Sequence, residues 1–224
     1  MDQEHIDSWK SSKQVFLDQL QRNQEELKTK PPPHWRTFID FVNKYNPKRV
    51  VDIGCGAGIY KLLHKYTSMN YQYNQYSPVD YIGYDYADAA IEVAKEAWKS
   101  DDVRTKYNTD CFHVKDYKDL TKADMSEGDA IVCNGLCTIL PNGDECLRHI
   151  LGLGVKQVLI QRQRVTKEPS ESQIYDAYGI KTYDFIYNRQ DILKDAEDNN
   201  YEVEFVHLYG ILDDTFDLIF TLKE

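Results

Sequence analysis

The chain has 224 residues, 42% of them hydrophobic, and a formal net charge of −10 at pH 7, so we expect one domain with a sizeable core. It has no apolar run of about 18 residues, which excludes a predicted membrane span, and its acidity argues against a broad nucleic-acid surface. Five cysteines without framework spacing, and a start that is neither basic nor apolar, predict a cytoplasmic protein with reduced thiols.

Two helices are predicted before the first strand. Residues 4–28 carry apolar side chains at helical spacing, and three prolines at 31–33 end this helix as a stiff link. Residues 34–45 form a second helix with Trp35 and Phe38 on one face. We therefore divide the chain into an N-terminal helical extension with a Pro-rich link, 1–33, and a main domain, 34–224. The first helix either packs on the domain edge or caps the ligand site.

A glycine-rich stretch at 49–58 follows, and the chain is organised around it. Val50, Val51 and Ile53 predict a short buried strand, and a helix is predicted from Ile59. Between them, alternating glycines allow a sharp turn and a close approach of a ligand to the backbone. The free N–H groups at the helix start favour an anionic group, so this turn predicts a cofactor site.

The pattern Asp52-Ile-Gly54-Cys55-Gly56-Ala-Gly58 resembles motif I of the class I S-adenosylmethionine (SAM)-dependent methyltransferases. The dinucleotide fingerprint would place its third glycine one residue later. The resemblance implies SAM as cofactor, bound by Asp52, Gly54, Cys55, Gly56 and Gly58. It also implies an α/β Rossmann-like three-layer sandwich whose mainly parallel seven-stranded sheet ends in an antiparallel hairpin. The methyltransferase domain would then span 34–224.

The next strands supply further candidates. Residues 81–85 form a strand ending in Asp85, whose carboxylate suits ribose hydroxyls and also suits a helix N-cap. The resemblance places Tyr86 beside the adenine. The tyrosine-rich segment 67–78 is either a lid, a substrate wall or a surface loop.

Two later strand ends complete the cofactor site implied by the resemblance. Residues 111–116 are predicted as the third strand, with Asp116 and Tyr117 near the adenine amino group and Asp110 as the competing acid. Residues 128–135 are the fourth, and Asn134-Gly135 resembles motif IV, which borders the methionine half of SAM and the substrate.

The C-terminal third combines an irregular segment with a regular ending. A fifth strand is predicted at 155–160, followed by irregular chain at 161–184 that carries the substrate-binding candidates Arg162, Arg164 and Tyr183. The arginines suit a carboxylate or phosphate, and the alternative is ordinary surface basicity. A helix at 188–199 and a hairpin of strands at 201–208 and 215–222 follow.

A rival site type is a zinc centre made by Cys133, Cys137, Cys146 and His149. Their spacing is not that of a paired knuckle, so we expect buried thiols and no metal.

Methyl transfer to a small-molecule acceptor is the predicted activity. The alternatives are an RNA or protein methyltransferase and a non-catalytic partner subunit with the same fold. A nucleic-acid partner and a membrane partner are not expected. No catalytic residue is assigned, and the candidate bases are His34, His113, Tyr183 and Asp184.

Overall fold

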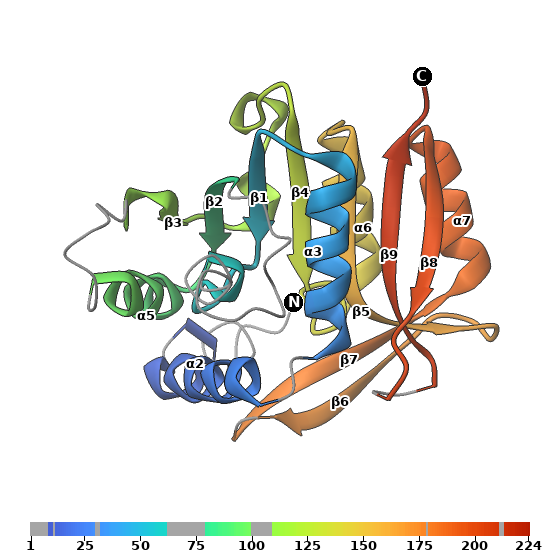
Figure 1. Ribbon diagram of the computed structural model, residues 1–224. Helices are drawn as coiled ribbons and strands as arrows, with labels where there is room; N and C mark the ends of the chain where they lie inside the picture. The colour runs from blue at the N-terminus through green and yellow to red at the C-terminus, as the bar shows by residue number, and fades with distance from the viewer. Residues whose placement is uncertain are drawn as a thin grey trace.

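The structure, a computed structural model, describes residues 9–10, 12–29, 32–61, 79–99, 109–177, 179–210 and 213–224. Its longer helices in this part are α2 Lys13–Lys28, α3 Pro33–Tyr45, α5 Asp88–Lys99, α6 Gly143–Gly152 and α7 Arg189–Asp198. Its strands are β1 Arg49–Ile53, β2 Asp80–Asp85, β3 Phe112–Val114, β4 Asp129–Asn134, β5 Gln157–Thr166, β6 Glu171–Ala177, β7 Ile180–Asn188, β8 Tyr201–His207 and β9 Thr215–Leu222 (Figure 1). The predicted segment 67–78 lies outside the described residues.

Local signals explain the ends of these helices. Pro33 opens α3 at a position where its missing N–H is harmless, and Asn46 closes the helix in a left-handed conformation with φ 44°. Asn188 caps α7, because its side chain accepts hydrogen bonds from the N–H groups of Gln190 and Asp191.

The strands form one mixed sheet in the order β3-β2-β1-β4-β5-β7-β6. Along this order, each pair of neighbours from β3 as far as β7 is parallel. The pairs β6–β7, β8–β9 and β5–β9 are antiparallel. The carboxyl ends of β1, β2 and β4 therefore meet at one edge of the sheet. The parallel sheet and the C-terminal antiparallel hairpin confirm the predicted fold class.

The described part of the sheet has nine strands, not the predicted seven. Residues 161–184, expected to be irregular, contain the second half of β5, all of β6 and part of β7. Strand β6 is an edge strand in which Ile174 and Tyr175 are exposed. A strand with little buried surface has no need of alternating apolar residues, so periodicity did not reveal it.

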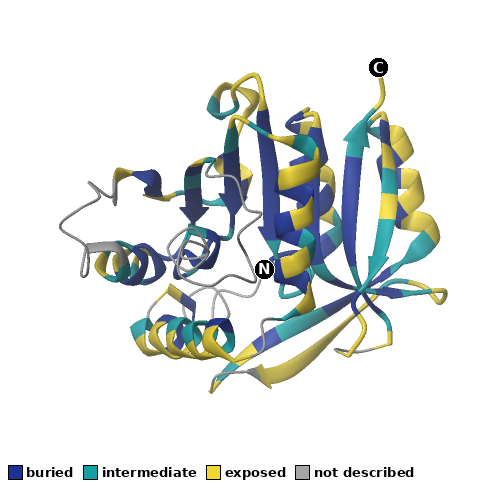
Figure 2. Ribbon diagram, in the orientation of Figure 1, coloured by how far each residue is buried: buried dark blue, intermediate teal, exposed yellow. Residues whose placement is uncertain are grey.

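Apolar residues of the central strands alternate between the two faces of the sheet. Val51 and Ile131 pack in a core with α6 and α7, whereas Val50 and Val132 pack in a second core with α3 and α5. Figure 2 shows the central strands buried and the outer faces of α3 exposed. These two cores make the three layers of the sandwich.

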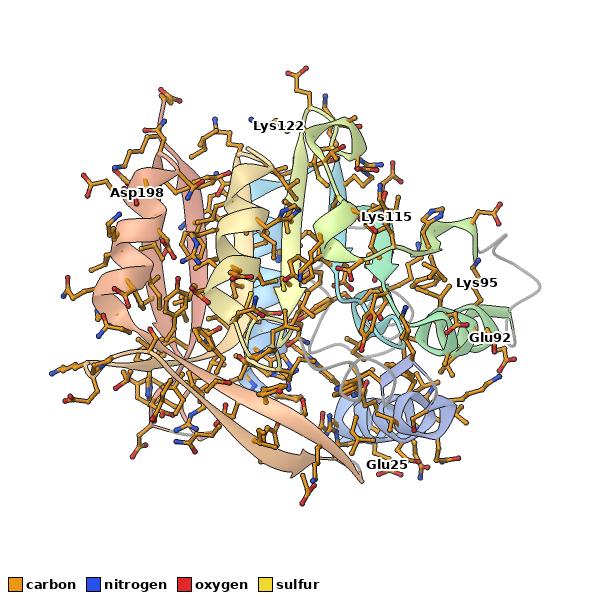
Figure 3. All side chains as sticks on the ribbon, turned by 180° about the vertical axis from the view of Figure 1, so that it is seen from behind. Glu25, Glu92, Lys95, Lys115, Lys122 and Asp198 are labelled. Atoms are coloured by element: carbon orange, nitrogen blue, oxygen red, sulfur yellow. The ribbon has the colours of Figure 1, made fainter. Side chains whose placement is uncertain are left out.

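Helix α2 packs beside α5 through a third cluster that includes Trp9, Phe16, Ala87 and Val93. Ile180, at the start of β7, packs against the same cluster. Charged residues such as Glu25 of α2 and Glu92 of α5 lie on the outer surface (Figure 3). The predicted helix 4–28 is interrupted at Ser12, after which α2 begins.

Within the described ranges, the helices are too short or too polar to cross a membrane.

Candidate active site

The glycine turn is tied to the end of β2. The N–H groups of Gly54 and Cys55 both donate to Tyr84 O, at 2.8 and 3.0 Å, and the N–H of Gly56 donates to Asp85 Oδ2 at 2.9 Å. The three glycines have φ values of 74°, 50° and 75°, a region that L side chains rarely adopt.

Two of these glycines have different surroundings. A Cβ on Gly58 would lie 2.7 Å from the ring of Phe112, so this glycine lets the turn pack on the sheet. A Cβ on Gly56 would have no neighbour closer than Gln19 Oε1, at 3.6 Å. The backbone at Gly56 is therefore open to an incoming group.

Two buried carboxylates flank this turn. Asp52 is 1% exposed; its Oδ2 accepts from the Tyr81 hydroxyl at 2.6 Å, and its Oδ1 has no hydrogen-bond partner among the described residues. Burial, opposed by the Tyr81 hydrogen bond and reinforced by the charge of Asp85, raises the pKa of Asp52 to about 7.

Asp85 is 7% exposed and accepts from the N–H groups of Gly56 and Ala87, both at 2.9 Å. Burial raises its pKa to about 6, although these backbone hydrogen bonds oppose the shift and the charge of Asp116 adds to it. The hydrogen bond from the Ala87 N–H lies just before α5, where a helix N-cap was the alternative role predicted for Asp85. The same residue also lines the cavity.

A cavity of about 400 Å³ lies in front of the glycine turn. The ends of β1, β2 and β4, the middle of β5, and parts of α2, α3, β6 and β7 form its walls. The predicted residues that line it are Asp52, Gly54, Cys55, Gly56, Asp85, Tyr86, Asn134, Gly135 and Arg162.

Other predicted residues lie outside these walls. Asp116 caps a short 3-10 helix by accepting from Lys118 N at 3.0 Å, and Tyr117 is buried with its ring edge-on to His149. The competing Asp110 is exposed and does not line the cavity either. Gly58 does not line the cavity and instead packs against the buried ring of Phe112.

Arg162 has an unusual backbone conformation at a β-bulge. Strand β5 shifts its register with β9 between Ile160 and Gln163, and Arg162 adopts a left-handed φ of 58°. Its N–H donates to Asp217 Oδ1 at 2.9 Å, its carbonyl accepts from Thr138 Oγ1 at 3.0 Å, and its Nε donates to Asn134 Oδ1 at 2.7 Å.

Arg164 and Tyr183 do not line the cavity. The Arg164 guanidinium forms ion pairs with Asp184 and Asp214, the latter at 2.6 Å. Both arginines were candidates from the same stretch of sequence, and the bulge sends only one of them to the cavity.

His34 is the one candidate base that lines the cavity. It lies in the first turn of α3, where its carbonyl accepts from Gln161 Nε2 at 2.7 Å, and its ring Nδ1 has no partner among the described residues. Burial, followed by the positive charges of Arg162 and Arg22, lowers the pKa of His34 well below its usual value. His113 is exposed, and Asp184 is paired with Arg164.

One face of α2 forms a wall of the cavity, and none of its residues was among the predicted site residues. Phe16, Gln19, Asn23 and Glu26 line it, and Arg22 joins them. The first four follow one another at intervals of three and four residues, which is the period of a helix face. The polar members of this stripe, Gln19, Asn23 and Glu26, were the signal in the sequence for the capping alternative.

The thiols of Cys133, Cys137 and Cys146 are buried and free of disulfides. His149 Nε2 lies 3.1 Å from the carbonyl oxygen of Leu120. The described residues contain no group of three metal-binding side chains.

The comparisons with known proteins agree with this architecture. A family model described as "Methyltransferase domain" matches residues 45–207. A search of curated protein sequences finds no significant match.

Solved structures share the fold at low identity. The chain is similar to magnesium protoporphyrin IX methyltransferase from Synechocystis PCC 6803 with bound S-adenosylhomocysteine (SAH), at 13% identity and a TM-score of 0.65, covering 97% of each chain. It is also similar to the N-terminal domain of EvdMO1 with SAH bound (12%, TM-score 0.57, 87% of this chain and 81% of that one). A third is a SAM-dependent methyltransferase from Clostridium acetobutylicum ATCC 824 (11%, TM-score 0.54, 84% and 89%). With a family match over most of its length and this fold, the chain belongs to the methyltransferase domain family and is a class I SAM-dependent methyltransferase.

Proposed function

We propose that this enzyme methylates a small-molecule acceptor inside the cavity described above, with SAM held by the residues of the glycine turn and the ends of β2 and β4. The observation that carries the proposal is the orphaned Oδ1 of Asp52, a buried carboxylate oxygen without a partner among the described residues, on the cavity wall. Leaving a buried polar atom unsatisfied costs about 1–3 kcal/mol, more for a charged group, so a polar ligand is favoured there.

The residues fit this donor at several points. Asp52 offers a negative oxygen to a cationic group, and Asp85 offers acceptor oxygens to a ribose, as a carboxylate can accept from two hydroxyls. The open backbone at Gly56 leaves room for close approach. Asp116 and Tyr117 keep the adenine role only as a prediction, since neither lines the cavity.

When bound, SAM supplies a methyl group already activated by a positively charged sulfur. The chain then has to position the acceptor and exclude water. Asn134 and Gly135 would lie between donor and acceptor, Arg162 is the residue we assign to the acceptor side, and α2 closes the opposite wall. Alignment of this kind contributes about 7–11 kcal/mol in favourable cases.

The size of the cavity supports a small acceptor. A volume of about 400 Å³ lies at the lower end of the roughly 300–1,000 Å³ of ligand sites, and it must serve donor and acceptor together. The net charge of −10 favours the same conclusion over an RNA acceptor. The fold occurs in a protein named as a magnesium protoporphyrin IX methyltransferase and in EvdMO1, whose N-terminal domain was crystallised with SAH.

Calorimetry with SAH tests the donor site. The wild-type enzyme should bind SAH, and Asp85→Asn should weaken binding by about tenfold or more. The reason is that a carboxylate has two oxygens that accept hydrogen bonds, whereas an amide has one. The matched control is Asp88→Asn, an exposed residue in the first turn of α5, which should bind SAH like wild type. Equal affinity in all three proteins would contradict the assignment of Asp85.

The alternatives have separate outcomes. A non-catalytic partner subunit would bind neither SAM nor SAH. A nucleic-acid acceptor would give a gel shift that weakens with salt, and no retention at low salt would remove it.

A further inference from the structure

Arg162 is held in a strained conformation by three hydrogen bonds. Its N–H, carbonyl and Nε are bound by Asp217, Thr138 and Asn134, respectively. A non-glycine residue with positive φ is strained, and it persists where the surrounding structure enforces it. In this case the surroundings fix both the backbone and the Nε of the arginine, so the direction of the guanidinium is set in advance.

The guanidinium of Arg162 carries a charge that no described carboxylate pairs. Among the described residues, no carboxylate forms an ion pair with the Arg162 guanidinium, and Nε is bonded to a neutral amide oxygen. Two residues later, Arg164 shows the contrasting case, in which two aspartates neutralise the side chain. Because Nε is already used, the two terminal nitrogens of Arg162 are the donors left for a ligand.

The groups around this guanidinium favour a ligand with one negative charge. Arg22 lines the same cavity, and His34 is kept neutral by burial and by the two arginines. Nδ1 of His34 and Oγ1 of Thr182, which have no partner among the described residues, are both buried on the cavity wall, at 6% and 1% residue exposure. They provide neutral hydrogen-bonding positions in the same cavity as the positive charge.

Carboxylates of the protein oppose a more highly charged ligand. Asp52, Asp85 and Glu26 line the cavity, and Glu26 lies 3.9 Å from Arg22. A phosphate dianion would be repelled by these groups and would have a single unpaired guanidinium to meet. A planar carboxylate matches two parallel N–H donors of one arginine.

We propose that the acceptor carries a carboxylate and that Arg162 is the residue that selects it through its terminal nitrogens. This inference rests on the proposed function, because it assigns the acceptor side of the same cavity. Arg162 would hold the acceptor whichever of its atoms receives the methyl group. Asn134 is a positioning residue, since its amide oxygen orients the guanidinium.

The test uses small probes in matched pairs: benzoate with benzamide, and phenylacetate with phenylacetamide, measured by NMR saturation transfer on the full chain saturated with SAH. In wild type, each carboxylate should bind about tenfold or more tightly than its amide, the range of a charge-assisted hydrogen-bond pair. Arg162→Gln should remove this preference, and Arg162→Lys should keep part of it. The control is Arg36→Gln, an exposed residue of α3 that pairs with Asp40 of the same helix, and this variant should behave like wild type.

Several outcomes would overturn the assignment. They are no carboxylate preference in wild type, a preference that survives in Arg162→Gln, tighter binding of inorganic phosphate than of both carboxylates, or a loss of SAH affinity in Arg162→Gln as large as the loss for benzoate. The last result would mean that Arg162 serves the donor. The same probe pairs are also measured without SAH, which separates the two proposals. If SAH does not bind, the proposed donor site is wrong, and the carboxylate preference measured without SAH still tests Arg162. Circular dichroism melts of each variant identify any that fails to fold.

Discussion

The guanidinium of Arg162 lies directly over Gly135, so that a Cβ on Gly135 would come within 2.5 Å of Arg162 Nη2. Gly135 follows β4, and Arg162 lies at the bulge of the neighbouring strand β5. The missing side chain of one residue thus makes the space for the cation of the other.

Gly135→Ala should therefore displace the arginine. We expect the carboxylate preference to fall as in Arg162→Gln, measured with the same probe pairs. The control is Gly154→Ala, whose φ of 73° gives the same strain of about 1–2 kcal/mol, while its Cβ would meet only Lys122 atoms at 3.7 Å. If the two variants have similar unfolding free energies and only Gly135→Ala loses the carboxylate preference, the contact between Gly135 and Arg162 is supported. An unchanged preference in Gly135→Ala contradicts it.

The glycines of the turn should separate packing from ligand approach. Gly58→Ala should lower the free energy of unfolding by about 2–4 kcal/mol, because its Cβ meets the buried Phe112 ring at 2.7 Å in addition to backbone strain. Gly56→Ala should cost about 1–2 kcal/mol for its backbone alone, yet it should lose SAH affinity, because its methyl group projects toward the cavity. Urea denaturation and calorimetry measure the two effects, and equal destabilisation by both variants would refute this division.

Asp52 should make stability depend on pH. Its folded pKa of about 7 lies above the usual value of about 3.9, so the folded state holds this proton more tightly. The stabilisation is fully present below about pH 4 and is lost as pH rises to about 7. Asp85, with a pKa of about 6, acts in the same direction over a narrower window.

Asp52→Asn should flatten part of this slope. We expect the variant to gain stability over wild type by at least about 1 kcal/mol on going from pH 5 to pH 8, since each pKa unit is worth about 1.4 kcal/mol. Urea denaturation at both values measures the difference. The exposed Asp119→Asn is the control, and a slope in Asp52→Asn identical to wild type would show that Asp52 titrates normally.

Helix α2 should depend on apolar packing more than on its ion pairs. Phe16 is 3% exposed and lines the cavity, so Phe16→Ala should cost about 3 kcal/mol and weaken SAH binding. Lys13→Met removes contacts to Glu92 and Glu96, whose side chains are 65% and 60% exposed, and should leave both the unfolding midpoint and SAH affinity unchanged. A larger effect from Lys13→Met than from Phe16→Ala would reverse this assignment.

Much of the fold follows from short-range patterns. The strand-turn-helix at 49–61 combines apolar alternation with glycines at positive φ, and both are readable from neighbouring residues. Strand β6 was missed because its residues are largely exposed, and the extension of β5 was missed because its polar residues are buried through partners far away. Gln161, for instance, is 0% exposed and bonds to Asp217 and to the carbonyl of His34.

The donor half of the candidate site could be predicted for the same reason. Asp85 and Asn134 end β2 and β4, and Asp52 lies one residue before the end of β1; parallel strands bring their carboxyl ends to one edge. Asp116 and Tyr117 were assigned by the same rule, yet they lie after the short strand β3 and outside the cavity walls.

The amino-acid sequence by itself determined the fold class, the glycine turn and the acids at the strand ends, because these depend on residues a few positions apart. Only the tertiary structure decided that α2 forms a cavity wall, that His34 and Arg162 line the same cavity, and that Arg164 is ion-paired while Arg162 has no ion pair among the described residues. Those relationships join segments distant in the chain, and a bulge of β5 that is bonded to β9 sets the direction of the arginine.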